Sequence, residues 1–257
     1  MNNDTIKKPL GMDFSGTDRK SVKGKLLRLT LRFLRPGRIM PILSGRLRGK
    51  KWIVDSSLPN CWLGTYEKEK QALFSRTVSP KSTVFDIGGN VGFYSLLASE
   101  LVGPEGRVFV FEPLPRNLDY LRQHLELNKS SNITVIEAAL SYKNGFAFFD
   151  AGPDGEMAQI SSSGQSRVRT CTLDQLYERG QIPVPDTIKM NIGGAEFAAL
   201  CRAKSLLSKA HPTIFLTTHG NPVHRECCAF LDLLGYRLAP IDGEPLDNSR
   251  ELIATHI

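Results

Sequence analysis

The sequence predicts an α/β fold, with a mostly parallel sheet covered by helices on both faces and a basic N-terminal extension. From Lys81 onward, short apolar runs of strand length alternate with segments of helical periodicity. This alternation is typical of a parallel sheet whose crossover helices pack on both faces. The chain of 257 residues suffices for one such domain, and its 41% apolar and 23% charged content excludes global disorder.

Five strands and four helices are expected in order along the chain. The strands are the apolar runs 84–87, 107–111, 133–136, 186–190 and 213–216. The helices follow the first, second, fourth and fifth of them and cover residues 92–101, 116–128, 196–207 and 223–234.

Between the third and fourth strands, residues 145–169 are rich in Gly and Ser and contain closely spaced phenylalanines. The alternation of Phe146, Phe148 and Phe149 predicts a hairpin. The serine-rich residues 161–166 predict a mobile loop.

Residues 1–50 are expected to form a basic arm and residues 51–257 the main domain. The arm holds 13 of the 33 Lys and Arg residues but only three of the 26 Asp and Glu residues. The main domain is therefore close to neutral, and no nucleic-acid partner is expected. Residues 25–35 predict a short amphipathic helix in this arm. It either packs on the body or makes weak contact with an anionic membrane surface or substrate. Its basic face consists of Lys25, Arg28, Arg32 and Arg35.

The five cysteines are odd in number and form no C-x-x-C pair. We therefore expect thiols of a reducing compartment and no metal site. The sequence has no run of 18 apolar residues and no apolar segment near its N-terminus, so neither a membrane span nor a secretory signal is expected. These features favour a cytoplasmic protein.

A glycine-rich turn joins the first strand to its helix. Glycines allow a sharp turn and let a ligand approach the backbone, and the following helix offers unpaired N–H groups. Open parallel sheets bind ligands at this edge, outside the carboxyl ends of their strands. We therefore expect a ligand site formed by Gly88, Gly89, Asn90 and Gly92.

Three ligands could use such a turn. A P-loop requires Gly-Lys-Ser or Gly-Lys-Thr, which is absent, and a dinucleotide site requires G-x-G-x-x-G, whereas the glycines fall at 88, 89 and 92. The third ligand, S-adenosylmethionine, has no phosphates. Its sulfonium and amino groups are cationic and suit Asp86 at the head of the turn, and its ribose suits Glu112 at the end of the second strand. These features together predict S-adenosylmethionine as the cofactor.

Several motifs resemble the FkbM family of methyltransferases. They are Val84–Tyr94, residues 102–108, Phe111-Glu112-Pro113 with Asn117, and residues 188–196, supplemented by residues 62–67, 172–174 and 217–219. The resemblance covers roughly residues 48–240 and is most specific in its first half. It implies a class I, Rossmann-like fold with a seven-stranded sheet. It also implies methyl transfer to a hydroxyl, commonly of a sugar or natural product.

The resemblance further implies that the adenine is bound near the end of the third strand, around residues 137–140, which include Glu137 and Ala138. Three positions depart from the family pattern. Its fourth-strand motif usually contains Asp and Glu where this chain has Asn191 and Gly193, and a common Glu near the end of the fifth strand is replaced by Thr217. Either a different base serves the acceptor, or the domain binds cofactor as a scaffold or sensor and catalyses poorly.

Methyl transfer to a hydroxyl requires alignment and a base that removes the acceptor's proton. His219, after the fifth strand, is the first candidate, because histidine titrates near neutral pH; a structural hydrogen bond is an equally good interpretation. Glu196 either stabilises the N-terminus of its helix or contacts the acceptor. Asn191 is placed at the mouth of the site, beside both cofactor and acceptor. His224 is a weaker candidate, expected at the surface.

A small-molecule or glycan acceptor is expected, with Trp62 and Tyr66 as candidates for an apolar wall over it. Two other enzyme classes rank lower. The glycine spacing disfavours a nicotinamide-dependent oxidoreductase. Methylation of nucleic acid is disfavoured because Phe33 is the one aromatic interleaved with the charges of the arm.

Overall fold

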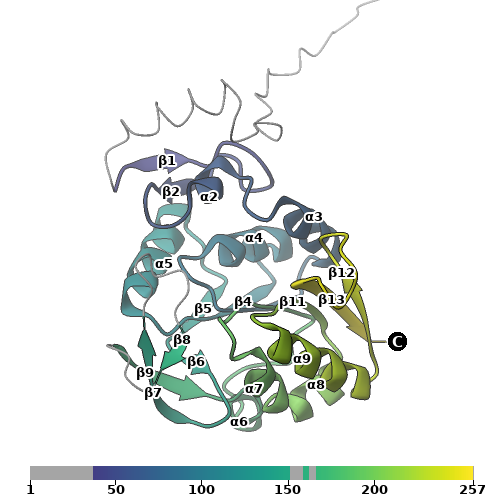
Figure 1. Ribbon diagram of the computed structural model, residues 1–257. Helices are drawn as coiled ribbons and strands as arrows, with labels where there is room; N and C mark the ends of the chain where they lie inside the picture. The colour runs from purple at the N-terminus through teal and green to yellow at the C-terminus, as the bar shows by residue number, and fades with distance from the viewer. Residues whose placement is uncertain (1–36, 151–158, 162–165, 257) are drawn as a thin grey trace, which may run out of the picture.

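The computed structural model describes residues 37–150, 159–161 and 166–256 (Figure 1). At its centre lies a seven-stranded sheet of order β12-β13-β11-β10-β3-β4-β5. All its pairs are parallel except those of β13, which runs antiparallel to β11 and β12. The predicted α/β class with a mostly parallel seven-stranded sheet is confirmed.

The strands that were predicted from apolar runs agree with the structure to within one residue at each end. The strands of the sheet are β3 (Thr83–Ile87), β4 (Arg107–Phe111), β5 (Ile133–Ile136), β10 (Thr187–Met190), β11 (Thr213–Thr217), β12 (Tyr236–Pro240) and β13 (Glu251–His256). The search for apolar runs did not predict β12 and β13. At this antiparallel side of the sheet, buried residues alternate with more exposed ones, so no continuous apolar run forms.

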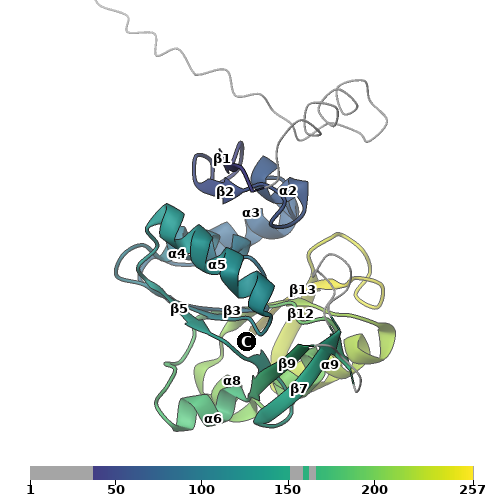
Figure 2. The same ribbon diagram turned by 90° about the vertical axis from the view of Figure 1, so that its left-hand side faces the viewer.

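Helices cover both faces of the sheet, as Figures 1 and 2 show. One layer contains α4 (Phe93–Val102) and α5 (Pro115–Asn128); the other contains α6 (Leu173–Glu178), α7 (Glu196–Cys201), α8 (Lys204–Ala210) and α9 (Asn221–Leu233). Adjacent residues of β3 enter different cores. Val84 packs with the α4 layer and Phe85 with the α7 and α9 layer, and both are fully buried.

The single helix predicted over residues 196–207 is wrong, because the chain forms two helices there, α7 and α8. The break lies at Ala203, which precedes α8. The Asp174 carboxylate accepts the backbone N–H groups of Ser205 at 3.1 Å and Leu206 at 2.8 Å. A side chain 31 residues away therefore caps the second helix.

A second sheet has the order β6-β9-β7-β8, and its strands β7 and β9 are seen in the foreground of Figure 2. Its strands are β6 (Ala139–Leu140), β7 (Gly145–Asp150), β8 (Gln159–Ser161) and β9 (Ser166–Cys171). The antiparallel pairing of β7 with β9 confirms the predicted hairpin. The expected mobile loop falls largely on residues 162–165, outside the described residues.

An N-terminal cap lies over α4 and α5 (Figure 1). It comprises β1 (Ile39–Pro41), β2 (Lys51–Ile53), α2 (Pro59–Leu63) and α3 (Lys68–Thr77). The antiparallel pair β1–β2 joins residues from both sides of the domain boundary expected at residue 50, which stays a prediction. The amphipathic helix expected over residues 25–35 lies outside the described residues. Within the described part of the chain, no helix has the length and apolarity needed to span a membrane.

Candidate active site

A cavity of about 230 Å³ lies at the carboxyl ends of β3, β4 and β10. At β3 the chain order of the sheet reverses, so neighbouring crossovers leave in opposite directions and open a crevice. Its walls come from the glycine turn, the end of β4, the segment before β6, the end of β10 and the N-terminal cap. The expected position of the ligand site is therefore a real concavity.

The glycine turn forms the floor of this cavity in a backbone shape that side chains would prevent. Gly88 has φ of +79°, and a Cβ on it would lie 2.0 Å from the carbonyl oxygen of Asn191. A Cβ on Gly89 would lie 2.2 Å from Cγ1 of Val110. Asn90 also adopts a left-handed conformation, with φ of 49°. Gly88, Gly89 and Asn90 line the cavity. Glycine is required at positions 88 and 89 because a side chain at either would clash with its neighbours.

Gly92 has a different role from the other predicted glycines. It begins α4 with φ of +98°, and a Cβ there would lie 2.6 Å from Cδ1 of Leu121. This glycine permits close packing of the turn against α5 and does not itself line the cavity.

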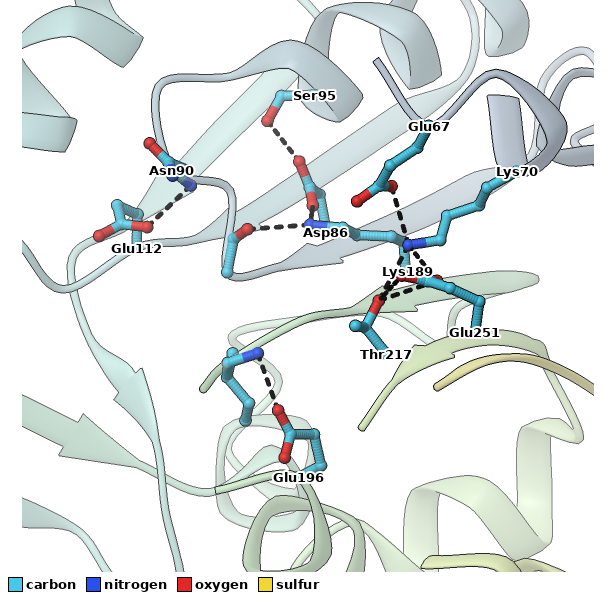
Figure 3. A network of polar contacts seen from close by, with 12 residues as sticks. Glu67, Lys70, Asp86, Asn90, Ser95, Glu112, Lys189, Glu196, Thr217 and Glu251 are labelled. Atoms are coloured by element: carbon cyan, nitrogen blue, oxygen red, sulfur yellow. Dashed lines mark hydrogen bonds and ion pairs between the residues drawn. The ribbon is translucent and has the colours of Figure 1, made fainter. Parts of the chain in front are cut away.

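Glu112, at the end of β4, is 4% exposed and faces the cavity. Its Oε2 accepts the backbone N–H of Asn90 at 2.8 Å (Figure 3). Its Oε1 accepts the N–H of Leu114 at 3.0 Å and an N–H of Asn117 Nδ2 at 3.2 Å. Pro115 at the start of α5 fixes the turn that brings these donors together. Burial raises the pKa of Glu112, and the three hydrogen bonds oppose that shift.

These contacts fit an adenosyl ligand. A carboxylate has about four acceptor positions, so Glu112 keeps one, on Oε2, for a ribose hydroxyl. The glycine backbone beside it leaves room for the sugar. The structure thus offers one free acceptor position for the ribose at the residue that the sequence indicated for it.

Asp86 lies beneath the glycine turn and is 1% exposed (Figure 3). Its Oδ1 is 3.1 Å from Nζ of Lys189, and its Oδ2 accepts the Ser95 hydroxyl at 2.7 Å. Lys189 also donates to the carbonyl oxygen of Gly88 at 2.9 Å. Asp86 does not line the cavity, whereas Lys189 does. The carboxylate is thus neutralised by a buried lysine, and its direct contact with the cofactor stays a prediction.

The segment expected to hold the adenine divides into two parts. Ala138, 2% exposed, lines the cavity together with Ala139 and Leu140. The Glu137 side chain is 55% exposed, forms an ion pair with Arg122 and lies outside the cavity. The structure thus brings Ala138, but not Glu137, to the candidate site.

His219 and Glu196 meet at the opposite wall. His219 lines the cavity with 29% of its side chain exposed, and its Nδ1 lies 2.8 Å from Oε1 of the fully buried Glu196. The same oxygen accepts the backbone N–H groups of Ile192 at 3.2 Å and Gly194 at 3.1 Å. Glu196 therefore holds both the loop after β10 and the histidine ring.

The remaining predicted residues are placed as follows. Asn191 and Gly193 line the cavity between the glycine turn and His219. Tyr66 also lines it, whereas Trp62 is buried in the core of the N-terminal cap. The surface position expected for His224 is wrong: it is 2% exposed, because its Nδ1 pairs with the Thr218 hydroxyl at 3.0 Å within α9's buried face.

A buried ionic network closes the side of the site beneath the N-terminal cap (Figure 3). Nζ of Lys70, 3% exposed, lies 2.8 Å from Oε2 of Glu67, donates to the Thr217 hydroxyl at 2.9 Å and pairs with Glu251 of β13. Thr217 also donates to Glu251. The position where the family commonly has a Glu therefore keeps a carboxylate nearby, supplied by another strand.

Tyr94, at the start of α4, connects this network to the cavity. Two cations lie near its ring, since the centroid is 5.8 Å from Nζ of Lys70 and 5.3 Å from Nζ of Lys189. Burial and the nearby Glu67 raise the pKa of the Tyr94 hydroxyl well above its ordinary value, so it stays neutral. Sequence reasoning missed Lys189 and Tyr94, although a lysine inside the apolar strand 187–190 was a usable signal.

Comparison with known proteins decides the family. Residues 86–238 match the family model described as "Methyltransferase FkbM domain", which is more than half of the chain. The chain belongs to the FkbM family of methyltransferases. The predicted family and its cofactor, S-adenosylmethionine, are thereby confirmed.

Individual relatives of this FkbM-family chain are distant. A hexuronic acid methyltransferase of Haloferax volcanii is 24% identical over 136 residues, 52% of this chain and 55% of that protein. A protein-L-isoaspartate O-methyltransferase of Ignicoccus hospitalis is 34% identical over 102 residues, 40% of this chain and 46% of that protein. The chain thus spans about half the length of these relatives. A solved FkbM methyltransferase from Methylobacillus flagellatus is 17% identical, with a TM-score of 0.46 over 77% of this chain and 52% of the other.

Proposed function

We propose that this FkbM-family domain transfers the methyl group of S-adenosylmethionine to a hydroxyl of a sugar or another small-molecule acceptor, with His219 as the base. The observation that supports this most directly is the 2.8 Å contact between His219 Nδ1 and Glu196 Oε1 in the wall of the cavity that Glu112 also faces. Cofactor-binding groups and a base candidate share one concave site.

In this proposal the cofactor's adenosyl part lies on the glycine turn. Glu112 accepts a ribose hydroxyl, Gly88 and Gly89 allow close approach of the sugar, and Ala138 forms part of the adenine pocket. The bound cofactor supplies a methyl group already activated by a positively charged sulfur. What the protein contributes is alignment of the acceptor, exclusion of water and removal of one proton.

The histidine and glutamate perform the proton step. With Nδ1–H donating to Glu196, Nε2 of His219 carries a lone pair and can accept the acceptor's hydroxyl proton. The Glu196 carboxylate then stabilises the imidazolium, because both are held in a partly buried pair. This pair offers a base where Asn191 and Gly193 lack carboxylates. It therefore favours altered acceptor chemistry over a loss of catalysis.

The acceptor class follows from the relatives and stays a proposal. The Haloferax relative is named for hexuronic acid and the Ignicoccus relative for isoaspartate. The sugar match extends over more of this chain, so a sugar hydroxyl is the first acceptor to test and a carboxylate the second.

The test is product detection by mass spectrometry with isotopically labelled cofactor and a panel of sugar, phenol and carboxylate acceptors. His219→Gln and Glu196→Gln should each lower turnover about 100-fold or more, as loss of general base catalysis does. Cofactor affinity should change less than about twofold, because neither residue contacts the adenosyl site in this proposal. Full activity of His219→Gln would refute its role as base. Cofactor binding with no product from any acceptor would favour the scaffold interpretation.

A further inference from the structure

We propose that the outer face of the β7–β9 hairpin binds an acidic unit of an oligosaccharide. This outer face is the surface formed by Phe146, Phe148, Arg167 and Arg169. The inference rests on the proposed function and deepens it, since it assigns the acceptor to the class of anionic sugars.

The register of the hairpin places these four side chains together. Phe148 is directly opposite Arg167, and Phe146 is directly opposite Arg169, in an antiparallel ladder. Since the intervening residues point to the other side, two rings and two guanidinium groups share one face. The Arg167 guanidinium carbon lies 3.9 Å from the centroid of the Phe146 ring.

The two phenylalanines are not needed to hold the hairpin on the domain. Phe146 is 57% exposed and Phe148 is 47% exposed. The inner face already supplies the packing, with Phe149 and Val168 each 5% exposed in a cluster with Leu114. Neighbouring aromatic rings at the surface, with a cation stacked on one of them, are a feature of binding surfaces.

The two arginines of this face form no ion pair with any side chain that the structure describes, a set that does not include Asp150 at the end of β7. The nearby Arg122, by contrast, pairs with Glu137. A guanidinium binds a carboxylate through two parallel hydrogen bonds, and a flat aromatic ring packs against the C–H face of a sugar. A sugar that bears a carboxylate uses both groups at once.

A long polyanion is a poorer fit for the same face. Residues 51–257 contain 20 basic and 23 acidic side chains, so the body does not provide the extended positive field that a nucleic acid requires. An acidic sugar needs a local pair of cations and no such field.

The outer face also lies close to the cavity along the chain. Phe148 belongs to the outer face, and the next residue, Phe149, lines the cavity. The same strand thus presents one side to the proposed site of methyl transfer and the other to solvent. An oligosaccharide with one sugar in the cavity must therefore pass round the edge of this sheet to contact the outer face with a sugar further along its chain.

The experiment is calorimetry on the full chain with a short oligogalacturonate and with its methyl ester, which has the same rings and no charge. We expect the acidic form to bind about tenfold more tightly. Phe148→Ala and Arg169→Gln should each weaken binding about fivefold or more. Two exposed residues elsewhere provide matched controls, and Leu233→Ala and Arg237→Gln should leave binding within about twofold.

S-adenosylmethionine is titrated into every variant. Unchanged cofactor binding with no preference for the acidic sugar, or with no effect of the hairpin variants, overturns this inference and leaves the proposed function standing. Absence of cofactor binding in the unmodified chain refutes the proposed function itself. Tighter binding of a single-stranded RNA that is lost in the same variants would assign the face to nucleic acid. A concentration-dependent dimer that Phe148→Ala abolishes would assign it to a second copy of the chain.

Discussion

His124 of α5 is expected to make both the fold and the cofactor site sensitive to acid. It is fully buried and stacked on Trp52, with ring centroids 3.9 Å apart. Its Nε2 accepts the backbone N–H of Ile53 at 3.0 Å, so Nδ1 carries the proton and donates to the carbonyl oxygen of Val91 at 2.7 Å. The neutral ring therefore joins the N-terminal cap to the glycine turn. Protonation of Nε2 would remove the lone pair that accepts the Ile53 N–H and would place two N–H groups against each other. This hydrogen bond would then break.

The size of the effect follows from the pKa. Burial lowers the pKa of His124 from 6.5 to about 4, so the folded protein binds this proton more weakly than the unfolded chain. As the pH falls below 6.5, the unfolded chain is protonated first and stability declines until the folded pKa is reached. The full loss is about 3 kcal/mol, and the loss at pH 5 is about 2 kcal/mol.

The assay is urea unfolding followed by tryptophan fluorescence, at pH 7.5 and pH 5, for the unmodified protein and His124→Phe. The variant keeps the stacking on Trp52 but leaves two buried backbone groups unpaired, which costs roughly 2–5 kcal/mol at both pH values. Between pH 7.5 and pH 5, the unmodified protein should therefore lose about 2 kcal/mol more of its free energy of unfolding than the variant does. His256→Gln, at an exposed histidine, serves as the control and should keep the original pH dependence. Equal pH dependence in His124→Phe and the unmodified protein would show that His124 does not cause the loss of stability in acid.

Two further predictions concern β10 and the loop after it. Lys189→Met should lower the free energy of unfolding by about 3–5 kcal/mol, because it leaves the Asp86 carboxylate buried without its cation. Denaturation midpoints test this prediction. Lys209→Met, which changes an exposed lysine, is the control. Asn191→Asp should leave stability nearly unchanged and raise turnover if a carboxylate at this position limits the reaction, which single-turnover kinetics measures. Gly193→Glu should cost about 1–2 kcal/mol, since Gly193 has φ of 66°, so an unchanged melting temperature in that variant would contradict the backbone argument.

The sequence predicted the parallel core because most of its strands are buried on both faces and consist mainly of apolar residues, as in residues 84–87 and 108–111. Its failures have physical causes. The division of residues 196–207 into two helices depends on Asp174, which approaches from a distant part of the chain. The strands β12 and β13 combine short length with alternating exposure, and local periodicity does not distinguish them from turns.

The site shows the same limit. Glu112 and the glycine turn were predictable because each follows a buried strand directly. The pairing of Asp86 with Lys189 was not, since it joins residues 103 positions apart across neighbouring strands. The contact of His219 with Glu196 likewise depends on how close the loop after β11 lies to the start of α7, which a sequence pattern does not encode.

Calorimetric titration of S-adenosylmethionine into the unmodified protein, Glu112→Gln and Glu137→Gln shows whether this cavity holds the cofactor. We expect binding to the unmodified protein and a loss of about 1–3 kcal/mol of binding free energy in Glu112→Gln, because a buried acceptor for the ribose is replaced by an amide. Glu137→Gln, which changes an exposed carboxylate outside the cavity, should bind as the unmodified protein does. No binding to the unmodified protein, or equal affinity in all three, would contradict the assignment of this cavity to the cofactor.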